Sequence, residues 1–426
     1  MADVGKKVLA SGGVKVGQAV LGIVTTLLLA RWLGAQDFGR CAFALTIGTL
    51  LSVMAQLGWP TLLTREIARS RIAGSWSRVR GVIRYSNWMV LGIGGVLACL
   101  PVLVGISMLS GPDARGGAAL IACGFFVPAA AFAGLRSASL RGLERVLSGQ
   151  LLDAVVRPVV FLATVLAMYA GLPLSPANVM VAQAFATVAA LLVGVWILAR
   201  ALPADFRVTT PEYESRAWLA SLGPLAFVSG AQIFSAQIDV VILGLMVDPA
   251  SVGSYKIAVT IASQVAFSTW LVNAVFAPHI VKLHVDGDDE GLRRLIRKGG
   301  LYSLVVAVPG LIVIFSLGGS GIAYLLGAGY RSAYVPMLIL AVGQLLAVSA
   351  GPVGLLLGMT GNEKYVARAV GASVVASAGL NVVLIHFYGV VGAAIATAAA
   401  LVMMRFLLFR YARRHVRAYG GSPDAT

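Results

Sequence analysis

Long apolar runs alternate with short polar segments along the whole chain. Most runs contain about 20 residues, the length that an α-helix needs to cross the hydrocarbon core of a bilayer. The pattern predicts about twelve transmembrane helices, at 13–33, 41–63, 82–108, 117–138, 151–170, 177–199, 218–246, 254–277, 300–317, 333–357, 367–386 and 391–410. The sequence therefore predicts an all-α, polytopic membrane protein.

Basic residues are distributed unevenly among the segments that connect these helices. Segments nearly free of Lys and Arg alternate with segments that are rich in them. Because basic residues near the ends of spans stay in the cytoplasm, the basic set marks the cytoplasmic side, and both termini are expected there. Five of the 33 basic residues fall on the opposite side, namely Arg31, Arg40, Arg115, Lys256 and Arg331.

Two stretches of the chain, 34–47 and 248–261, are similar to one another. They share a turn, a glycine (Gly39 and Gly253) and a Thr-Ile pair. Prolines also recur at equivalent places: Pro60 and Pro278 are expected to close two of the predicted helices, and the pairs 101 and 309, and 128 and 336, lie within predicted helices. The alternative is chance similarity between apolar segments. If the repeat is real, each half has six spans, and the halves are parallel repeats related by an axis along the membrane normal.

This repeat predicts a division into two six-helix bundles. The expected parts are an N-terminal bundle at 1–199, a cytoplasmic linker at 200–217, and a C-terminal bundle at 218–426 that ends in a basic cytoplasmic tail. Two helical bundles with a cavity between them are the architecture of a transporter.

Composition and charge exclude several other classes of protein. Only 12% of the residues are charged, against about 25% in soluble domains, which leaves no room for a large soluble catalytic domain. The net charge of +16 would suggest nucleic-acid binding in a soluble protein. Here basic segments alternate with segments that are poor in Lys and Arg. This pattern indicates that the positive charge orients the protein in the membrane and contacts anionic lipids of the inner leaflet, so no nucleic acid is expected. Without a P-loop or the residue spacing of a zinc site, we expect no ATP hydrolysis, metal or cofactor.

Several short motifs resemble those of bacterial polysaccharide flippases. These are the Wzx-type O-antigen and exopolysaccharide translocases, which belong to the superfamily that includes the MATE multidrug exporters. The motifs are loose turn-and-glycine patterns spread over essentially the whole chain. They are Ala30–Gly34, Asp37–Gly39, Gln56–Gly58, Arg65–Arg69, Gly327–Tyr330 and Leu356–Lys364. At Arg40 and Cys41 the chain departs from the family, in which an aromatic residue commonly follows the Phe-Gly pair.

The resemblance implies a MATE-like fold in the bacterial inner membrane. It also implies a non-enzymatic flippase that moves undecaprenyl-diphosphate-linked oligosaccharide to the periplasmic leaflet by alternating access, together with polysaccharide assembly proteins. One alternative is a cation-coupled multidrug exporter of the same fold. That function needs an acid in the first half, where the predicted spans contain only Asp153. Another alternative, a membrane glycan polymerase, needs a large loop that the sequence lacks.

Asp239 is the most informative single residue, because it lies within a predicted span. A charged side chain near the centre of a span costs roughly 2.5 to 3.5 kcal/mol, so it is expected to face a cavity or a partner. It could bind a coupling Na⁺ or H⁺ or contact sugar hydroxyls, or it could form a structural ion pair with Lys256 or Arg31. Gln232 and Gln237 lie on the same helix, and their amides suit either sugar recognition or hydrogen bonds between helices.

The diphosphate that the resemblance implies would need cations. Lys15 and Gln18, three residues apart, share a helix face near the cytoplasmic end of the first span. Lys15 could contact the phosphate groups or could anchor the helix at the interface. Arg31, Arg40 and Lys256 are candidates on the outer side, although Asp37 offers the two arginines a local ion pair. The candidate substrate-binding residues are Lys15, Gln18, Arg31, Arg40, Gln232, Gln237, Asp239 and Lys256.

Overall fold

The chain folds into two compact helical units in a computed structural model that describes residues 2–171, 173–203 and 205–415. The first unit consists of Met1–Leu33 and Asp37–Phe234, and the second consists of Gly34–Gln36 and Ser235–Thr426. The described residues contain no strand. The predicted all-α class is therefore confirmed.

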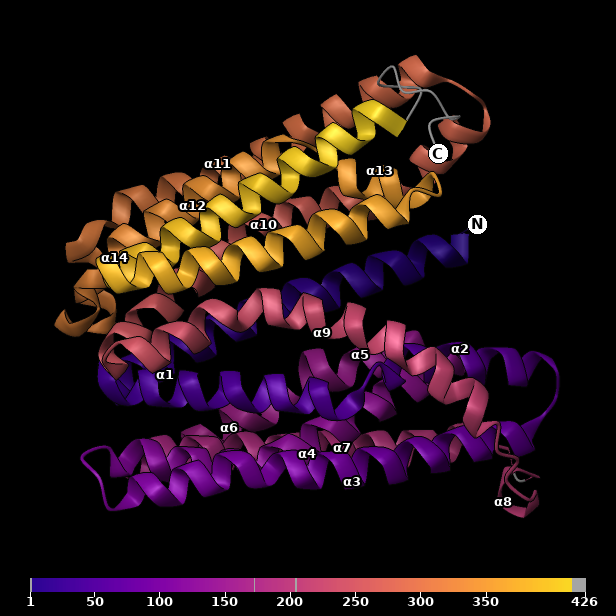
Figure 1. Cartoon of the computed structure of the whole chain (residues 1–426), viewed down its shortest axis with the longest axis horizontal. Coiled ribbons are helices and arrows are strands. Elements are labelled where there is room, and N and C mark those ends of the chain that lie inside the picture. The colour runs from indigo at the N-terminus through magenta and orange to yellow at the C-terminus, as the bar shows by residue number, and fades with distance from the viewer. Residues whose placement is uncertain (1, 172, 204, 416–426) are drawn as a thin grey trace. The chain divides into compact units, whose positions relative to one another are not determined.

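The first unit is built from helices that succeed one another with short turns (Figure 1). Its elements are α1 (Ala2–Gln56), α2 (Trp59–Ile72), α3 (Trp76–Leu109), α4 (Ala114–Gly142), α5 (Val146–Leu151), the π-helix η1 (Leu152–Val156), α6 (Arg157–Gly171), α7 (Pro176–Ala201) and α8 (Asp205–Val208). The boundary between the units falls inside α9 (Ser215–Met246).

The second unit continues from the end of α9. Its elements are α10 (Pro249–Val285), α11 (Asp289–Leu326), the 3₁₀-helix η2 (Ala328–Ala333), α12 (Tyr334–Ser349), α13 (Val353–Met359) and α14 (Glu363–His415). One hydrophobic core of this unit is formed by apolar side chains such as Phe276, Ile280, Leu356 and Leu408.

The predicted spans and the observed helices correspond once the bends are included. Nine helices of the described part are long and apolar enough to cross a membrane. Two of them, α1 and α14, each hold two predicted spans, because Gly34 (φ 74°) and Gly389 (φ 54°) leave the helical conformation. Such positive φ values are accessible to glycine at little cost. The loops predicted at 34–40 and 387–390 are therefore wrong in extent, since a single glycine makes most of each turn.

The predicted boundaries of two further helices are also wrong. The helix expected at 41–63 ends at Gln56, because Leu57 and Gly58 have positive φ, and the chain restarts as α2. Pro278 does not close a helix as expected but lies inside α10, which continues to Val285. Pro101, Pro128 and Pro309 lie within α3, α4 and α11, as predicted.

The described residues of the segment expected to be a linker, 200–217, group with the first unit. This segment packs against the first unit, because Leu202 and Phe206 contact the hydrophobic core of that unit. The backbone N–H of Glu212 also donates to the carbonyl of Ser77 at 3.1 Å. The contacts divide the chain between Phe234 and Ser235 instead.

Close helix packing in the first unit depends on small residues. α4 packs between α3 and α7 (Figure 1). A Cβ atom on Gly105 would lie 2.6 Å from the carbonyl oxygen of Gly117, and one on Gly124 would lie 2.4 Å from Val102. Small residues that let backbones approach are typical of helix pairs in membranes.

The outward faces of these helices are strongly apolar. In the first unit, large side chains such as Val96, Leu103, Phe125 and Leu192 are more than half exposed. Exposed apolar surface on this scale is unfavourable in water and suits a lipid environment. This exposed apolar surface and the nine long apolar helices of the described residues are those of a multi-pass membrane protein.

Candidate functional site

The carboxylate of Asp239 is the centre of a buried polar site in the second unit. Asp239 is 5% exposed, and Tyr255 is fully buried. The Tyr255 hydroxyl donates to Asp239 Oδ2 at 2.6 Å, and the Thr397 hydroxyl donates to the same oxygen at 3.4 Å. The backbone N–H of Val240 donates to Oδ1 at 2.8 Å. All of these donors are neutral.

Three helices bring these groups together. Asp239 is on α9, Tyr255 is on α10, and Thr397 is on the part of α14 that follows Gly389. The turn between α9 and α10 is fixed by Asp248, whose carboxylate accepts from the Ser251 backbone N–H at 3.0 Å and from its hydroxyl at 2.8 Å. Asp248 is thus an N-cap, followed by Pro249 in the first turn.

Hydroxyl groups, and not the ion pair that was one of the two alternatives, contact the carboxylate of Asp239 directly. Lys256 is half-buried, and its charge interacts with that of Asp239. Within the described part of the chain, however, Asp239 makes no direct ion pair. Lys256 follows Tyr255, and successive residues of a helix point about 100° apart, so the tyrosine faces the carboxylate and the lysine does not. Arg31 is exposed and belongs to the first unit.

This arrangement suits exchange of a positive charge. An ionised carboxylate in a low-dielectric interior is costly when its partners are neutral. Binding a proton or a small cation would remove that cost, and the hydroxyls of Tyr255 and Thr397 could reorient, since a hydroxyl both donates and accepts. The described residues contain no group of three or more His, Cys, Asp and Glu side chains that could hold a metal ion.

The two amides of α9 lie in different surroundings. Gln232 is exposed and belongs to the first unit, whereas Gln237 is half-buried and belongs to the second. Among the described side chains, the Gln237 Oε1 atom is a buried oxygen without a hydrogen-bond partner. A buried, unsatisfied amide oxygen is an available acceptor, so Gln237 is better placed than Gln232 to meet a hydroxyl or a water.

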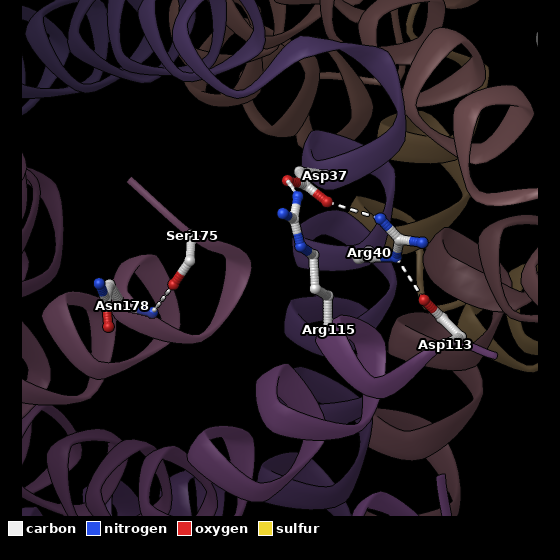
Figure 2. Close-up of polar contacts among 6 residues, drawn as sticks. All are labelled: Asp37, Arg40, Asp113, Arg115, Ser175 and Asn178. Atoms are coloured by element: carbon white, nitrogen blue, oxygen red, sulfur yellow. Dashed lines mark hydrogen bonds and ion pairs between the residues drawn. The ribbon is translucent and has the colours of Figure 1, made fainter. Parts of the chain in front are cut away.

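A second cluster of charges lies in the first unit, where α1 meets the turn between α3 and α4 (Figure 2). Arg40 bridges two carboxylates: its Nη1 lies 2.6 Å from Asp37 Oδ1, and its Nε lies 2.5 Å from Asp113 Oδ1. Arg115 binds the other oxygen of Asp37 at 3.0 Å. The expected ion pair of Arg40 with Asp37 is confirmed, and the guanidinium is held by two acids.

The Ser175 hydroxyl, which Figure 2 also shows, accepts from the Asn178 backbone N–H at 3.2 Å and caps α7. Lys15 and Gln18 are both half-buried on the first part of α1.

The sequence interpretation missed a buried arginine. Arg136 is 8% exposed inside the first unit and donates a hydrogen bond to Asn87 Oδ1 of α3. Its stem packs against Gly194 of α7. The signal was available, because Arg136 falls inside the apolar run predicted at 117–138 and Asn87 inside the run at 82–108.

A second polar contact in the first unit joins α4 to the π-helix. The Ser137 hydroxyl donates to Asp153 Oδ2 at 2.8 Å. Asp153 lies in η1, where the Arg157 N–H bonds to the Leu152 carbonyl five residues earlier. The acid that was predicted near a helix start is therefore hydrogen-bonded inside the bundle.

Two units of apolar helices with polar groups buried inside them define the class of a multi-pass membrane protein. Solved structures share the fold over nearly the whole chain. The inward-facing conformation of a multidrug resistance MATE family transporter of the MOP superfamily matches with a TM-score of 0.72 and 15% identity, over 96% of each chain. The inward closed conformation of the lipid II flippase MurJ matches with a TM-score of 0.71 and 11% identity, over 95% of this chain and 87% of that one. At these identities the likeness shows the fold alone.

Residues 4–284 match the family described as "Polysaccharide biosynthesis protein", so the chain belongs to this family. The family resemblance expected from the sequence is confirmed. A Haloferax volcanii protein with the name "Probable low-salt glycan biosynthesis flippase Agl15" is 28% identical over 181 residues, which are 42% of this chain. The match spans only 38% of that protein's length.

Proposed function

We propose that this chain flips a lipid-linked oligosaccharide, carried on undecaprenyl diphosphate, from the cytoplasmic to the periplasmic leaflet of a bacterial inner membrane. It acts as a carrier and not as an enzyme, by alternating access, in the synthesis of a surface polysaccharide such as O-antigen or exopolysaccharide. The family match over residues 4–284 carries the proposal. The flippase name of the Haloferax volcanii relative supports it.

The proposal assigns the diphosphate to basic side chains at the ends of the spans. Lys15 and Gln18 meet it near the cytoplasmic end, and Arg31 and Lys256 near the outer end. Arg40 is the least suited of these cations, because Asp37 and Asp113 already neutralise it. Amides such as Gln237 meet the sugar, since an amide group both donates and accepts hydrogen bonds.

Asp239 is assigned to the coupling of transport to an ion gradient. Its buried carboxylate with neutral donors supports uptake of H⁺ or Na⁺ during the cycle. Exposed bases at the start of α11, namely Arg293, Arg294, Arg297 and Lys298, are assigned to anionic lipids of the inner leaflet. Both termini face the cytoplasm, where assembly proteins of the polysaccharide pathway act.

The second candidate function is cation-coupled drug export. The fold of the MATE transporter, with a TM-score of 0.72, favours it. Such an exporter would use an acid of the first half, and Asp153 is the available one, hydrogen-bonded to Ser137. The family match, which is to polysaccharide biosynthesis, favours the flippase.

Deletion of the gene tests the two candidates against each other. Flipping predicts that undecaprenyl-diphosphate oligosaccharide accumulates on the cytoplasmic face and that surface polysaccharide is lost, with both effects reversed by complementation. Drug export predicts raised drug sensitivity with normal surface polysaccharide, and that result would overturn the proposal. Purified protein in liposomes with a fluorescent lipid-linked glycan then measures flipping directly, with the Asp239→Asn variant for comparison.

A further inference from the structure

The segment between α8 and α9 is pinned along the start of α3. The Glu212 backbone N–H donates to the Ser77 carbonyl at 3.1 Å, and the Ser77 hydroxyl donates to Glu212 Oε2 at 3.3 Å. Arg80 donates to the Thr209 carbonyl at 2.5 Å. Arg78 forms ion pairs with Glu212 at 3.5 Å and with Glu214. We call residues 209–214 the strap.

Gly81 sets how closely the strap can approach α3. A Cβ atom at this position would lie 1.8 Å from the carbonyl oxygen of Glu212 and 2.8 Å from its carbonyl carbon. Both are backbone atoms of the strap, so no side-chain rotation relieves the overlap. Any residue other than glycine would therefore move the strap away from the helix.

The residues that follow the strap are anchored in the same core. Trp218 and Leu222 are buried with Trp59 in the first unit, and Leu225 packs against them. The ring of Tyr85 on α3 lies 5.7 Å from that of Trp218. Most of these contacts are apolar, so they persist when the exposed ion pairs of Arg78 exchange with water.

Beyond this anchor, α9 passes into the second unit. From Ser235 onward its residues belong to that unit, and Ile238, Val240 and Leu243 are buried there. In between, a Cβ atom on Gly230 would meet nothing within 4 Å.

We propose that the strap stays docked on α3 throughout the transport cycle, as a fixed part of the first unit. The chain between the halves then does not work as a free linker. Relative movement of the two units is taken up inside α9, after Leu225 and before Ile238. The inference rests on the proposed function only in requiring that the two units move during transport.

A disulfide across the contact tests the proposal. Ser77→Cys and Glu212→Cys are combined in a Cys99→Ser background, since Cys99 is the exposed natural cysteine, whereas Cys41 and Cys123 are buried. We expect nearly complete cross-linking in membranes and a flipping rate within about twofold of the reduced protein, a change of about 0.4 kcal/mol in the barrier. Loss of flipping on oxidation that is restored by reduction would overturn the proposal, and so would a low cross-linking yield.

The cross-linking yield is measured without any transport. If the parent protein flips no lipid-linked glycan, the proposed function fails, while a high or low yield still supports or overturns the docked strap.

Gly81→Ala provides a second test, because it adds a Cβ atom to α3 that overlaps the backbone of the strap. It is expected to lower the cross-linking yield of the cysteine pair severalfold. Gly92→Ala is the matched control on the same helix, because a Cβ atom there would meet nothing within 4 Å. Equal yields in the two variants would show that the strap does not lie against Gly81, contrary to the proposal.

Discussion

Two acidic clusters of this protein are stabilised in opposite ways. In the first unit, Asp37 and Asp113 are neutralised by Arg40, and Arg115 binds Asp37 as well. In the second unit, Asp239 is more deeply buried, yet its direct partners are the hydroxyls of Tyr255 and Thr397 and a backbone N–H. The deeper carboxylate therefore has the weaker electrostatic compensation.

The difference teaches what each cluster can do. A carboxylate fixed by a guanidinium keeps its charge and its geometry, so the first cluster holds α1 to the turn between α3 and α4. A carboxylate whose direct partners are neutral donors is left free to take up a proton or a small cation. The first cluster is suited to stability and the second to exchange of an ion, and substitutions can separate these roles.

The largest effect is expected from Asp239→Asn. The amide keeps the size of the side chain and an oxygen for Tyr255, but it cannot bind a proton or a cation at neutral pH. We expect flipping in liposomes to fall by about a hundredfold, equivalent to about 2.7 kcal/mol in the barrier. The thermal stability of the detergent-solubilised protein should be equal or higher, because a buried charge is removed.

Asp113→Asn is the matched control in the first unit. It makes the same chemical change at an acid that faces Arg40, and it should leave flipping within about twofold, under 0.5 kcal/mol in the barrier. Equal losses of flipping in the two variants would break the comparison between the clusters.

The next effect is on stability, from Arg40→Gln. Arg40 is 11% exposed in its side chain, and its removal leaves two facing carboxylates without their shared cation. Unpaired charges in a partly buried site cost about 2 kcal/mol. Chemical or thermal unfolding measures this loss, and flipping per folded molecule should not change.

Arg115→Gln sharpens this prediction within the same cluster. Arg115 binds Asp37, but its side chain is 72% exposed, and exposed ion pairs contribute only about 0 to 1 kcal/mol. A loss of stability as large as that of Arg40→Gln would contradict the role given to burial.

Tyr255→Phe is expected to have an intermediate effect, on transport. The ring still fills its buried position, while the shortest hydrogen bond to Asp239 is lost. We expect flipping to fall about tenfold, or about 1.4 kcal/mol, with a shift in its dependence on the coupling ion. Thr397→Val, which removes the longer bond at 3.4 Å, should have a smaller effect, and the reverse order would show that Tyr255 does not position the carboxylate.

Much of the fold follows from the sequence, because apolar length and charge asymmetry are local properties. The long apolar helices and the position of Asp239 within one of them could be predicted from apolar length. The sharp bends at Gly34 and Gly389 could not, since glycine occurs at 49 positions and only the packing decides which of them adopt positive φ.

The hydrogen-bond partners of Asp239 could not be predicted from local properties of the sequence. Thr397 lies 158 residues away in the chain, so its contact depends on how α9, α10 and α14 pack. The sequence favoured Lys256 as a partner because of its positive charge, but the residue that bonds to Asp239 is its neighbour Tyr255. Successive residues of a helix point in different directions, so an error of one position selects the wrong side chain. The burial of Arg136 was overlooked because a basic residue near the end of a span fits the positive-inside rule equally well when it is buried.

The smallest effect is expected at Asp248, an acid between the two extremes. It lies at a turn, as Asp37 does, but its partner is Ser251 and no arginine. Burial acts to raise the pKa of this carboxyl, but hydrogen bonds from the Ser251 hydroxyl and backbone outweigh it, so the pKa lies below its ordinary value of 3.8. The carboxylate therefore stabilises the fold above that ordinary value, and the stabilisation is lost as pH falls through the lower pKa of the folded state.

Asp248→Ala should accordingly destabilise the protein by about 0.5 to 1 kcal/mol at pH 7. The difference from the parent protein should shrink as the pH falls below about 4. Unfolding curves measured across this range provide the check, with Asp248→Asn as the control, because an asparagine caps a helix without a titratable charge. A difference that stays constant from neutral to acidic pH would show that the cap acts through its shape alone. Asp248 would then differ from both clusters, in which the charge of the carboxylate matters.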